Sequence, residues 1–214
     1  MQRIYDIILT AEVDFARAVA LGVVVKRPLT AWHFLIPGMF IFDFFRRTSE
    51  IKRYSDLFLT PRKLALAAAL DICKGEDRKN KLFRIEEEIG QWLVSLKLYS
   101  ARLQLRQMEA MQVLIDHYSK LLNVEGNSYH SLVENAYKTR ENYEAYLSRL
   151  ASTEREIDRA IAEMEAETQD IWERLQREQL QVDDLRKKEV NKIFSTMRQV
   201  NNGKDFADGS GHEV

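Results

Sequence analysis

The chain has 214 residues, of which 45% are apolar and 30% are charged, a balance typical of a folded protein rather than a disordered one. A single cysteine, Cys73, excludes an internal disulfide framework and any zinc site built from several cysteines. The net charge of −1 is unevenly spread, because residues 1–63 carry 10 basic and 6 acidic side chains whereas residues 127–214 carry 13 and 18. Only 8 glycines and 3 prolines are present, and strand patterns are absent after the last proline, so we predict an all-α protein.

Residues 4–25 are expected to form a helix with one apolar side, because apolar residues recur at helical spacing at Ile4, Ile8, Ala11, Phe15 and Ala18. Acidic residues in this segment do not fit a signal peptide, which favours a cytoplasmic protein. The helix is expected either to pack on the segment that follows it or to lie in a membrane interface.

Residues 29–45, here called the aromatic segment, are apolar apart from Thr30, His33 and Asp43. A straight helix of these 17 residues would span about 26 Å, less than a hydrocarbon core of roughly 30 Å. Pro37 and Gly38 interrupt the segment at its centre and favour a reversal of the chain. We therefore predict a re-entrant wedge that enters one leaflet and does not span. The side chains expected to contact the membrane are Trp32, Phe34, Leu35, Ile36, Pro37, Met39, Phe40, Ile41, Phe42, Phe44 and Phe45.

Basic residues flank the aromatic segment on both sides, and Arg62 and Lys63 follow further on. Basic flanks on both sides are expected if both ends emerge on the cytoplasmic face, at the inner side of the membrane. No nucleic acid is expected as a partner, because these cations enclose phenylalanines rather than polar loops. The basic residues predicted to bind anionic lipid are Lys26, Arg27, Arg46, Arg47, Lys52 and Arg53.

A short connecting helix is expected over residues 60–74, with Thr60 as N-cap, Pro61 at its first position and Gly75 after its end. It separates the N-terminal region, residues 1–58, from the remainder of the chain.

An antiparallel helical hairpin is expected over residues 80–201. Apolar residues from Leu82 onward alternate by three and four and predict a coiled-coil helix over 80–122. Residues 128–200 contain no glycine or proline and predict a second, longer helix. Residues 202–214 lack periodicity and are expected to form a disordered tail.

Unequal helix lengths predict self-association. The second helix of such a hairpin would extend beyond the first and leave an apolar stripe uncovered. A homo-oligomer would bury that stripe, whose residues are Trp172, Leu175, Val182, Leu185, Ile193 and Phe194.

Motifs for catalysis or cofactor binding are absent from the sequence, so neither enzymatic activity nor a cofactor is expected. The nearest approach to a metal site is His117, His130 and Glu134, which the hairpin would place near its tip. Polar residues beside a solvated turn are far commoner than metal ligands, so no metal site is expected there either.

The sequence thus favours a non-enzymatic, monotopic membrane-associated scaffold or tether that binds anionic lipid through the aromatic segment. Two alternatives stay open. One is a soluble structural or adaptor coiled coil whose aromatic segment docks on another protein, and the other is an accessory subunit seated on an integral membrane complex through the same segment.

Overall fold

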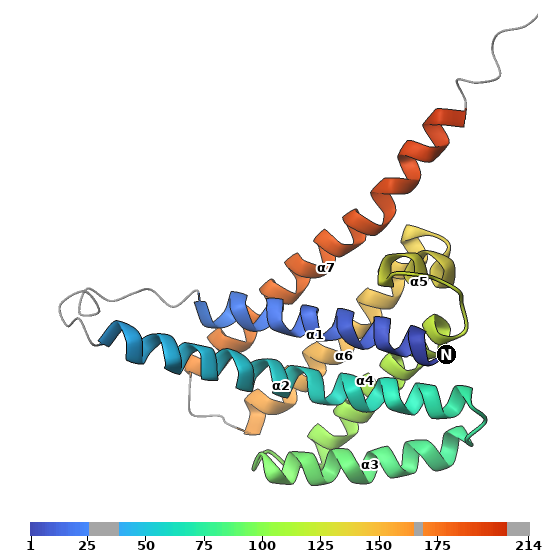
Figure 1. Cartoon of the computed structure of the whole chain (residues 1–214). Coiled ribbons are helices and arrows are strands. Elements are labelled where there is room, and N and C mark those ends of the chain that lie inside the picture. The colour runs from blue at the N-terminus through green and yellow to red at the C-terminus, as the bar shows by residue number, and fades with distance from the viewer. Residues whose placement is uncertain (26–38, 165–168, 205–214) are drawn as a thin grey trace, which may run out of the picture.

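The structure, a computed structural model, describes residues 1–25, 39–164 and 169–204, with side chains for residues 1–23, 49–164 and 175–195. The described residues form seven helices and no strand, which confirms the all-α prediction. The helices are α1 (Gln2–Val25), α2 (Met39–Cys73), α3 (Arg78–Ser95), α4 (Ala101–Leu122), α5 (Tyr129–Tyr137), α6 (Arg140–Met164) and α7 (Gln169–Lys204) (Figure 1).

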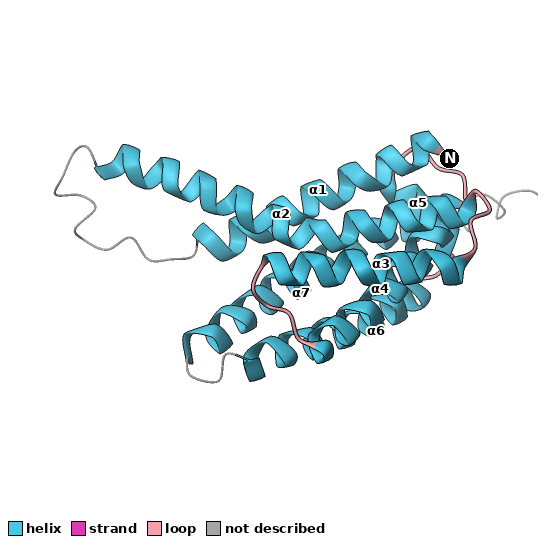
Figure 2. Ribbon diagram, turned by 90° about the horizontal axis from the view of Figure 1, so that it is seen from below, coloured by secondary structure: helices cyan, strands magenta, loops and turns pink. Residues whose placement is uncertain are grey.

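Five of these helices form a closed ring. α1 packs on α2, α2 on α4, α4 on α6 and α6 on α7, and α7 returns to pack on α1. α3 lies outside the ring against α2 and α4, and the short α5 covers one end by contacting α1, α4, α6 and α7 (Figures 1 and 2). The ring therefore has an interior that all five long helices share.

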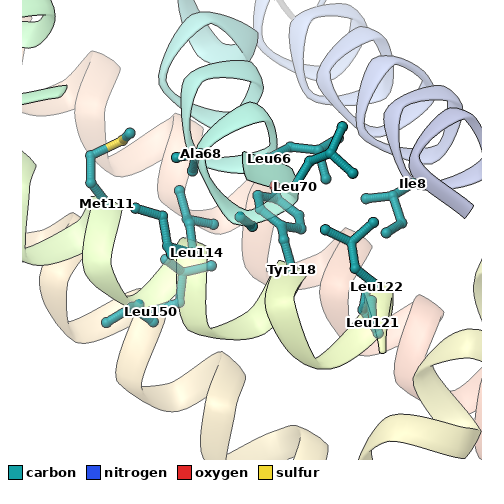
Figure 3. Packing of buried hydrophobic residues seen from close by; sticks show 14 of the residues in the cluster. Ile8, Leu66, Ala68, Leu70, Met111, Leu114, Tyr118, Leu121, Leu122 and Leu150 are labelled. Carbon is teal, nitrogen blue, oxygen red and sulfur yellow. The ribbon is translucent and has the colours of Figure 1, made fainter. Parts of the chain in front are cut away.

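Apolar side chains from the ring helices fill much of this interior (Figure 3). Ile8 of α1, Leu66 of α2, Tyr118 of α4 and Leu150 of α6 are almost completely buried. Burying a side chain of this size contributes roughly 1.5–3 kcal/mol. Small residues let α2 approach its neighbours closely, since its buried face includes Ala65, Ala68 and Ala69.

A glycine marks the place where α7 crosses α1. A Cβ atom at Gly22 would lie 2.1 Å from Cδ of Gln181. The absence of a side chain at Gly22 thus lets the two helices meet without displacing Gln181.

The predicted helix over 80–122 is wrong in its continuity, because the structure divides it into α3 and α4. Lys97 adopts a φ of 61°, and the N–H of Leu98 donates to the carbonyl of Leu93 at 3.0 Å, which closes the end of α3. Ser100 then caps α4 by accepting a hydrogen bond from the N–H of Leu103 at 3.1 Å. The predicted end of this region, near residue 122, is confirmed by the end of α4 at Leu122.

The predicted helix over 128–200 is also wrong in its continuity. α5 ends where Lys138 takes a φ of 65°, and Thr139 caps α6 by accepting from the N–H of Asn142 at 3.3 Å. α6 and α7 are separate helices on either side of residues 165–168, which lie outside the described residues. A folded bundle thus replaces the expected two-helix hairpin.

The connecting helix expected over 60–74 is the last part of α2, which continues through Pro61. Thr60 does not cap a helix; its hydroxyl donates to the carbonyl of Asp56 at 2.8 Å. The predicted stop is confirmed, since the helix ends at Cys73 and Gly75 follows with a φ of 105°. At the other end of the chain α7 runs to Lys204, so it includes the first residues of the predicted tail, and residues 205–214 lie outside the described residues.

One end of the molecule, here called the projecting end, is formed by the last turns of α1 and the first turns of α2. The two helices lie side by side, and the start of α2 continues beyond the end of α1 and away from the rest of the ring (Figures 1 and 2). This end carries the residues that precede and follow the undescribed residues 26–38.

Candidate functional site

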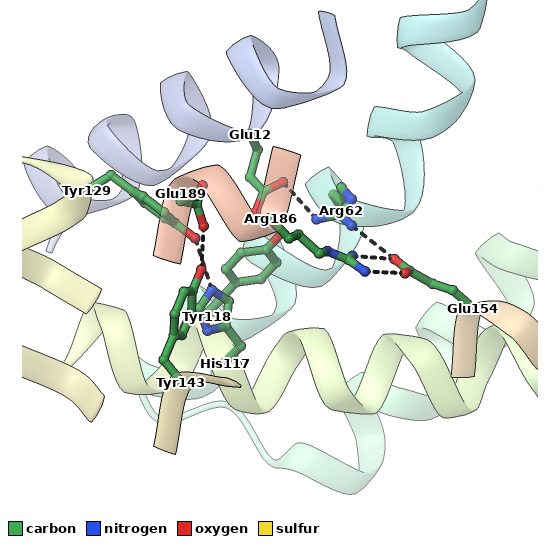
Figure 4. A network of polar contacts seen from close by, with 9 residues as sticks. All are labelled: Glu12, Arg62, His117, Tyr118, Tyr129, Tyr143, Glu154, Arg186 and Glu189. Atoms are coloured by element: carbon green, nitrogen blue, oxygen red, sulfur yellow. Dashed lines mark hydrogen bonds and ion pairs between the residues drawn. The ribbon is translucent and has the colours of Figure 1, made fainter. Parts of the chain in front are cut away.

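The centre of the ring contains four charged side chains, here called the ion-pair network: Glu12, Arg62, Glu154 and Arg186 (Figure 4). Arg62 donates to Glu12 at 2.9 Å and to Glu154 at 3.1 Å. Arg186 donates to both carboxylate oxygens of Glu154, at 2.7 and 2.8 Å. The four residues come from α1, α2, α6 and α7, so the network connects four of the five ring helices.

α4 completes the network through Tyr118, whose hydroxyl donates to Glu12 at 2.8 Å. Each ring helix therefore supplies one polar side chain to the same centre. The guanidinium of Arg62 also lies over the rings of Phe58 at 4.6 Å and Phe15 at 5.7 Å. Arg62 as a whole is only 6% exposed, and these cation–π contacts help to cover its guanidinium.

A cluster of aromatic side chains lies beside the network around His117 (Figure 4). The imidazole stacks on the ring of Tyr146, with centroids 4.1 Å apart. Nδ1 of His117 is 2.7 Å from the hydroxyl of Tyr137, and Nε2 is 3.4 Å from that of Tyr129. Both ring nitrogens of His117 therefore face phenolic hydroxyls.

The charged and neutral states of these groups follow from their surroundings. Burial opposes the charge of Arg62, but the carboxylates of Glu12 and Glu154 outweigh it and raise the pKa of this guanidinium above its usual value. Burial likewise opposes the charge of Glu154, yet Arg186 and Arg62 hold its pKa below the usual range. Burial, followed by repulsion from Arg62, lowers the pKa of His117 well below the ordinary value, so this imidazole is neutral at pH 7.

The ion-pair network fixes the relative positions of the helices. Truncating one partner of such a pair is costly, because it leaves a buried charge without compensation. A cavity of about 30 Å³ adjoins the network and has room for a single water. All four charges of the ion-pair network are paired with one another. The network, also called the clamp below, therefore has a structural role: it holds the ring helices in place.

A larger cavity of about 290 Å³, here called the interhelical cavity, lies next to the clamp. Arg62 and Glu154 form part of its wall, which links it directly to the ion-pair network. Most of its lining is apolar and comes from α2, α3, α4, α6 and α7, including Phe58, Trp92, Leu114, Ile157, Leu175 and Val182. Its size lies at the lower end of the range found for small-molecule sites.

Three further carboxylates line this cavity, Asp158 of α6 with Glu178 and Asp183 of α7. Asp158 and Glu178 are half-buried, and Asp183 is exposed. Among the described residues, Asp158 has no hydrogen-bond or ion-pair partner. Burial, with repulsion from Glu178 and Glu154, raises the pKa of Asp158 to about 7.

The three residues weighed as a metal site are not brought together. His117 is buried against tyrosines, whereas His130 is half-buried near the start of α5. His117, His130 and Glu134 are all described, and no group of three metal-ligating side chains forms among the described residues. The three residues therefore do not form the metal-binding group that was considered as a weak candidate.

Most residues predicted to contact the membrane lie where the structure gives no side chains. Lys26, Arg27 and the first part of the aromatic segment, through Gly38, lie outside the described residues. The backbone of residues 39–47 belongs to α2, but their side chains are not described. Lys52 and Arg53 are exposed, whereas Arg62, which the sequence grouped with the flanking cations, is buried in the ion-pair network. Within the part of the chain that is described, no helix combines the length and apolar character needed to cross a membrane.

The stripe expected to mediate self-association is partly covered within the chain. Val182, Ile193 and Phe194 are buried, and Leu175 and Leu185 are half-buried. The side chain of Trp172 is not described. The described helices do not form the two-helix hairpin that motivated the prediction, although the last turns of α7 run beyond the other helices (Figure 1), so self-association stays a prediction.

Comparisons with known proteins give no relative: no family model matches the chain, and no curated protein or solved structure is significantly similar to it. The function must therefore be inferred from the geometry and chemistry of the molecule.

The sequence interpretation missed the ion-pair network, although a signal for it is present. Glu12 follows Ile8 by four residues and precedes Phe15 by three, so its charge lies on the apolar side of its helix. Arg186 lies in the same way between Val182 and Val190. Charges of opposite sign on the apolar faces of different helices indicate a buried pair, because only a partner makes such burial tolerable.

Proposed function

We propose that this protein is a peripheral membrane scaffold, which binds an anionic membrane surface through its projecting end and presents the helical ring at the cytoplasmic face. The observation that carries the proposal is the position of two apolar chain segments at this end. Residues 18–25, with the sequence AVALGVVV, end α1, and residues 39–45, with the sequence MFIFDFF, begin α2. Residues 39–45 lie where α2 continues beyond the end of α1 (Figure 2), whereas residues 18–25 lead up to this end and still pack partly on the ring, since Val19 and Ala20 are buried.

The composition of this end supports a lipid partner. Apolar and aromatic residues at the tip favour transfer from water, and the cations around them favour an anionic headgroup layer. Lys52 and Arg53, both exposed, lie on α2 just behind the apolar residues. Each such cation near the surface contributes about 1 kcal/mol to binding.

The ring suits the scaffold part of the proposal. The ion-pair network fixes five helices relative to one another, and a rigid body can hold a partner or a second copy at a defined position. A scaffold positions its partners at the membrane and does not catalyse a reaction, in keeping with the absence of a recognised catalytic motif from the sequence. Self-association and a coiled-coil contact with a partner are further parts of this proposal.

Vesicle flotation with purified full-length protein tests the proposal. The wild-type chain is expected to float with vesicles containing anionic lipid, and the double variant Phe40→Glu plus Phe44→Glu is expected to stay at the bottom, because two charges oppose insertion of the tip. The matched control is Phe83→Glu plus Leu105→Glu, which introduces the same charges at side chains 63% and 57% exposed on α3 and α4. The control is expected to float like the wild type.

The electrostatic part is tested by Lys52→Ala plus Arg53→Ala. Losing two cations is expected to weaken binding to anionic vesicles by roughly 30-fold, the equivalent of about 2 kcal/mol. High salt is expected to reduce binding of the wild type. A wild-type chain that stays unbound at low salt would refute the membrane proposal and favour docking on another protein.

A further inference from the structure

We propose that the interhelical cavity is a binding site for a cationic amphiphile, a molecule with a short apolar body and one ammonium group. This inference is independent of membrane binding, because the cavity lies between α2, α3, α4, α6 and α7 whereas the proposed membrane contact lies at the projecting end. It begins from a combination that neither the clamp nor the fold requires: an apolar cavity of about 290 Å³ with carboxylates in its wall.

The apolar part of the cavity defines the body of the ligand. Phe58, Trp92 and Leu114 come from three different helices and enclose the space together with Ile157 of α6 and Val182 of α7. Ligand sites of this kind gain most of their affinity from apolar contact and use few polar groups to fix orientation. A chain or ring of moderate size fits this description.

The carboxylates define the charge of the ligand. Glu154 has two guanidinium partners, whereas Asp158, one helical turn further along α6, has none among the described residues. Glu178 and Asp183 of α7 are further carboxylates of the same wall, and Arg62, the one cation among the described lining residues, is paired with Glu12 and Glu154. A bound ammonium group would supply the counter-charge that Asp158 lacks.

The proposal is tested by calorimetric titration of the full-length protein with three probes of equal chain length: octylammonium, 1-octanol and octanoate, all below micellar concentrations. The titration is done at pH 8, where Asp158 is mostly ionised, because burial raises its pKa only to about 7. Saturable binding of one octylammonium per chain is expected, with weaker binding of octanol and none of octanoate.

Two variants and a control locate the site. Asp158→Asn keeps the shape and removes the charge, and it is expected to weaken octylammonium binding about tenfold while leaving octanol unaffected. Ala151→Phe fills the cavity from α6 and is expected to abolish binding of both ligands. The control, Glu156→Gln, removes a carboxylate of the same helix that pairs with Arg159, and it is expected to bind like the wild type.

Several results would overturn the proposal. They are octanoate binding as tightly as octylammonium, no binding of any probe, or unchanged octylammonium affinity in folded Asp158→Asn. Since Asp158→Asn is nearly isosteric, it keeps the test decisive even if Ala151→Phe does not fold. Equal weakening in Glu156→Gln would show attraction to the acidic surface of the protein rather than to the cavity.

Discussion

The clamp and the interhelical cavity share a wall, but the carboxylate of the clamp, Glu154, has cation partners and the carboxylate in the cavity wall, Asp158, has none among the described residues. Glu154 accepts hydrogen bonds from both Arg62 and Arg186, at 2.7 to 3.1 Å, whereas Asp158 on the same side of α6 has no partner among the described residues. Both face the cavity, and both are held by the same helix. Glu154 and Asp158 therefore differ in whether a cation is bound to them, and not in the helix that carries them.

The pKa values of the two carboxyl groups follow this difference. Burial opposes ionisation of both groups, but the two guanidiniums lower the pKa of Glu154, whereas repulsion from Glu178 and Glu154 adds to the effect of burial at Asp158 and raises its pKa to about 7. A carboxylate with built-in partners stabilises the folded chain, and one without partners costs stability once it ionises. The charges of the clamp are thus paired within the protein, whereas Asp158 in the cavity wall has no cation partner among the described residues.

The largest change in stability is expected from removing the negative charge of Glu154, the carboxylate of the clamp that binds two guanidiniums. Glu154→Gln leaves Arg186 without its carboxylate partner in a buried position, and we expect a loss of about 3 kcal/mol in the free energy of unfolding. Urea denaturation at pH 7 measures this loss. The control is Glu156→Gln, which breaks the exposed pair with Arg159 and is expected to cost less than about 0.5 kcal/mol. Similar small losses in both variants would show that the network does not clamp the ring.

A substitution at Asp158 is expected to raise the free energy of unfolding rather than to lower it. The folded-state pKa of about 7 lies above the ordinary aspartate value of 3.8, so between these two pH values the folded chain holds a proton that the unfolded chain has released. Stability contributed by this group is therefore present in full below pH 4 and is lost as the pH rises through 7. Asp158→Asn removes the loss, and we expect the variant to be more stable than the wild type by about 2 kcal/mol at pH 8, after allowance for solvent screening.

Urea denaturation of wild type and Asp158→Asn at pH 4, 6 and 8 measures this dependence. The difference between them is expected to be near zero at pH 4 and to grow toward pH 8. A difference that does not vary with pH would mean that Asp158 ionises as it does in the unfolded chain, and the contrast with Glu154 would then fail.

The fold class could be predicted from the sequence, but the path of the chain could not. Helical periodicity and the scarcity of glycine and proline correctly indicated helices, and the predicted helix end near residue 122 agrees with the end of α4 at Leu122. The breaks at Lys97 and Lys138 escaped notice because a lysine rarely adopts a positive φ, and because the apolar spacing continues across both turns. When those turns are not recognised, the sequence pattern of this bundle is the same as that of a long two-helix hairpin.

The centre of the ring could be predicted only in part. The charges of Glu12 and Arg186 on apolar helix faces indicate buried ion pairs, but sequence alone does not say which cation meets which anion. Arg62 was grouped with the basic residues near the aromatic segment because local sequence does not reveal that its face of α2 points inward. The cavity depends on five helices meeting, and no local pattern encodes such a meeting.

The smallest effect concerns the geometry of the clamp rather than its charge. Arg186→Lys keeps the positive charge but loses the two parallel hydrogen bonds to Glu154, since an ammonium group lacks the planar fork of a guanidinium. We expect a loss of about 1 kcal/mol in the free energy of unfolding. The matched exchange Arg159→Lys at the exposed pair with Glu156 is expected to change stability by less than about 0.5 kcal/mol.

A double-mutant cycle shows whether this loss arises at Glu154. If Arg186 acts through Glu154, the exchange to lysine costs much less in the Glu154→Gln background than in the wild type, because the bonds it weakens are already reduced. An unchanged cost in that background would place the role of Arg186 elsewhere, in packing of its apolar stem between Val182 and Val190 on α7. The size of the coupling therefore decides whether the two guanidinium bonds, or merely the presence of a cation, distinguish Glu154 from Asp158.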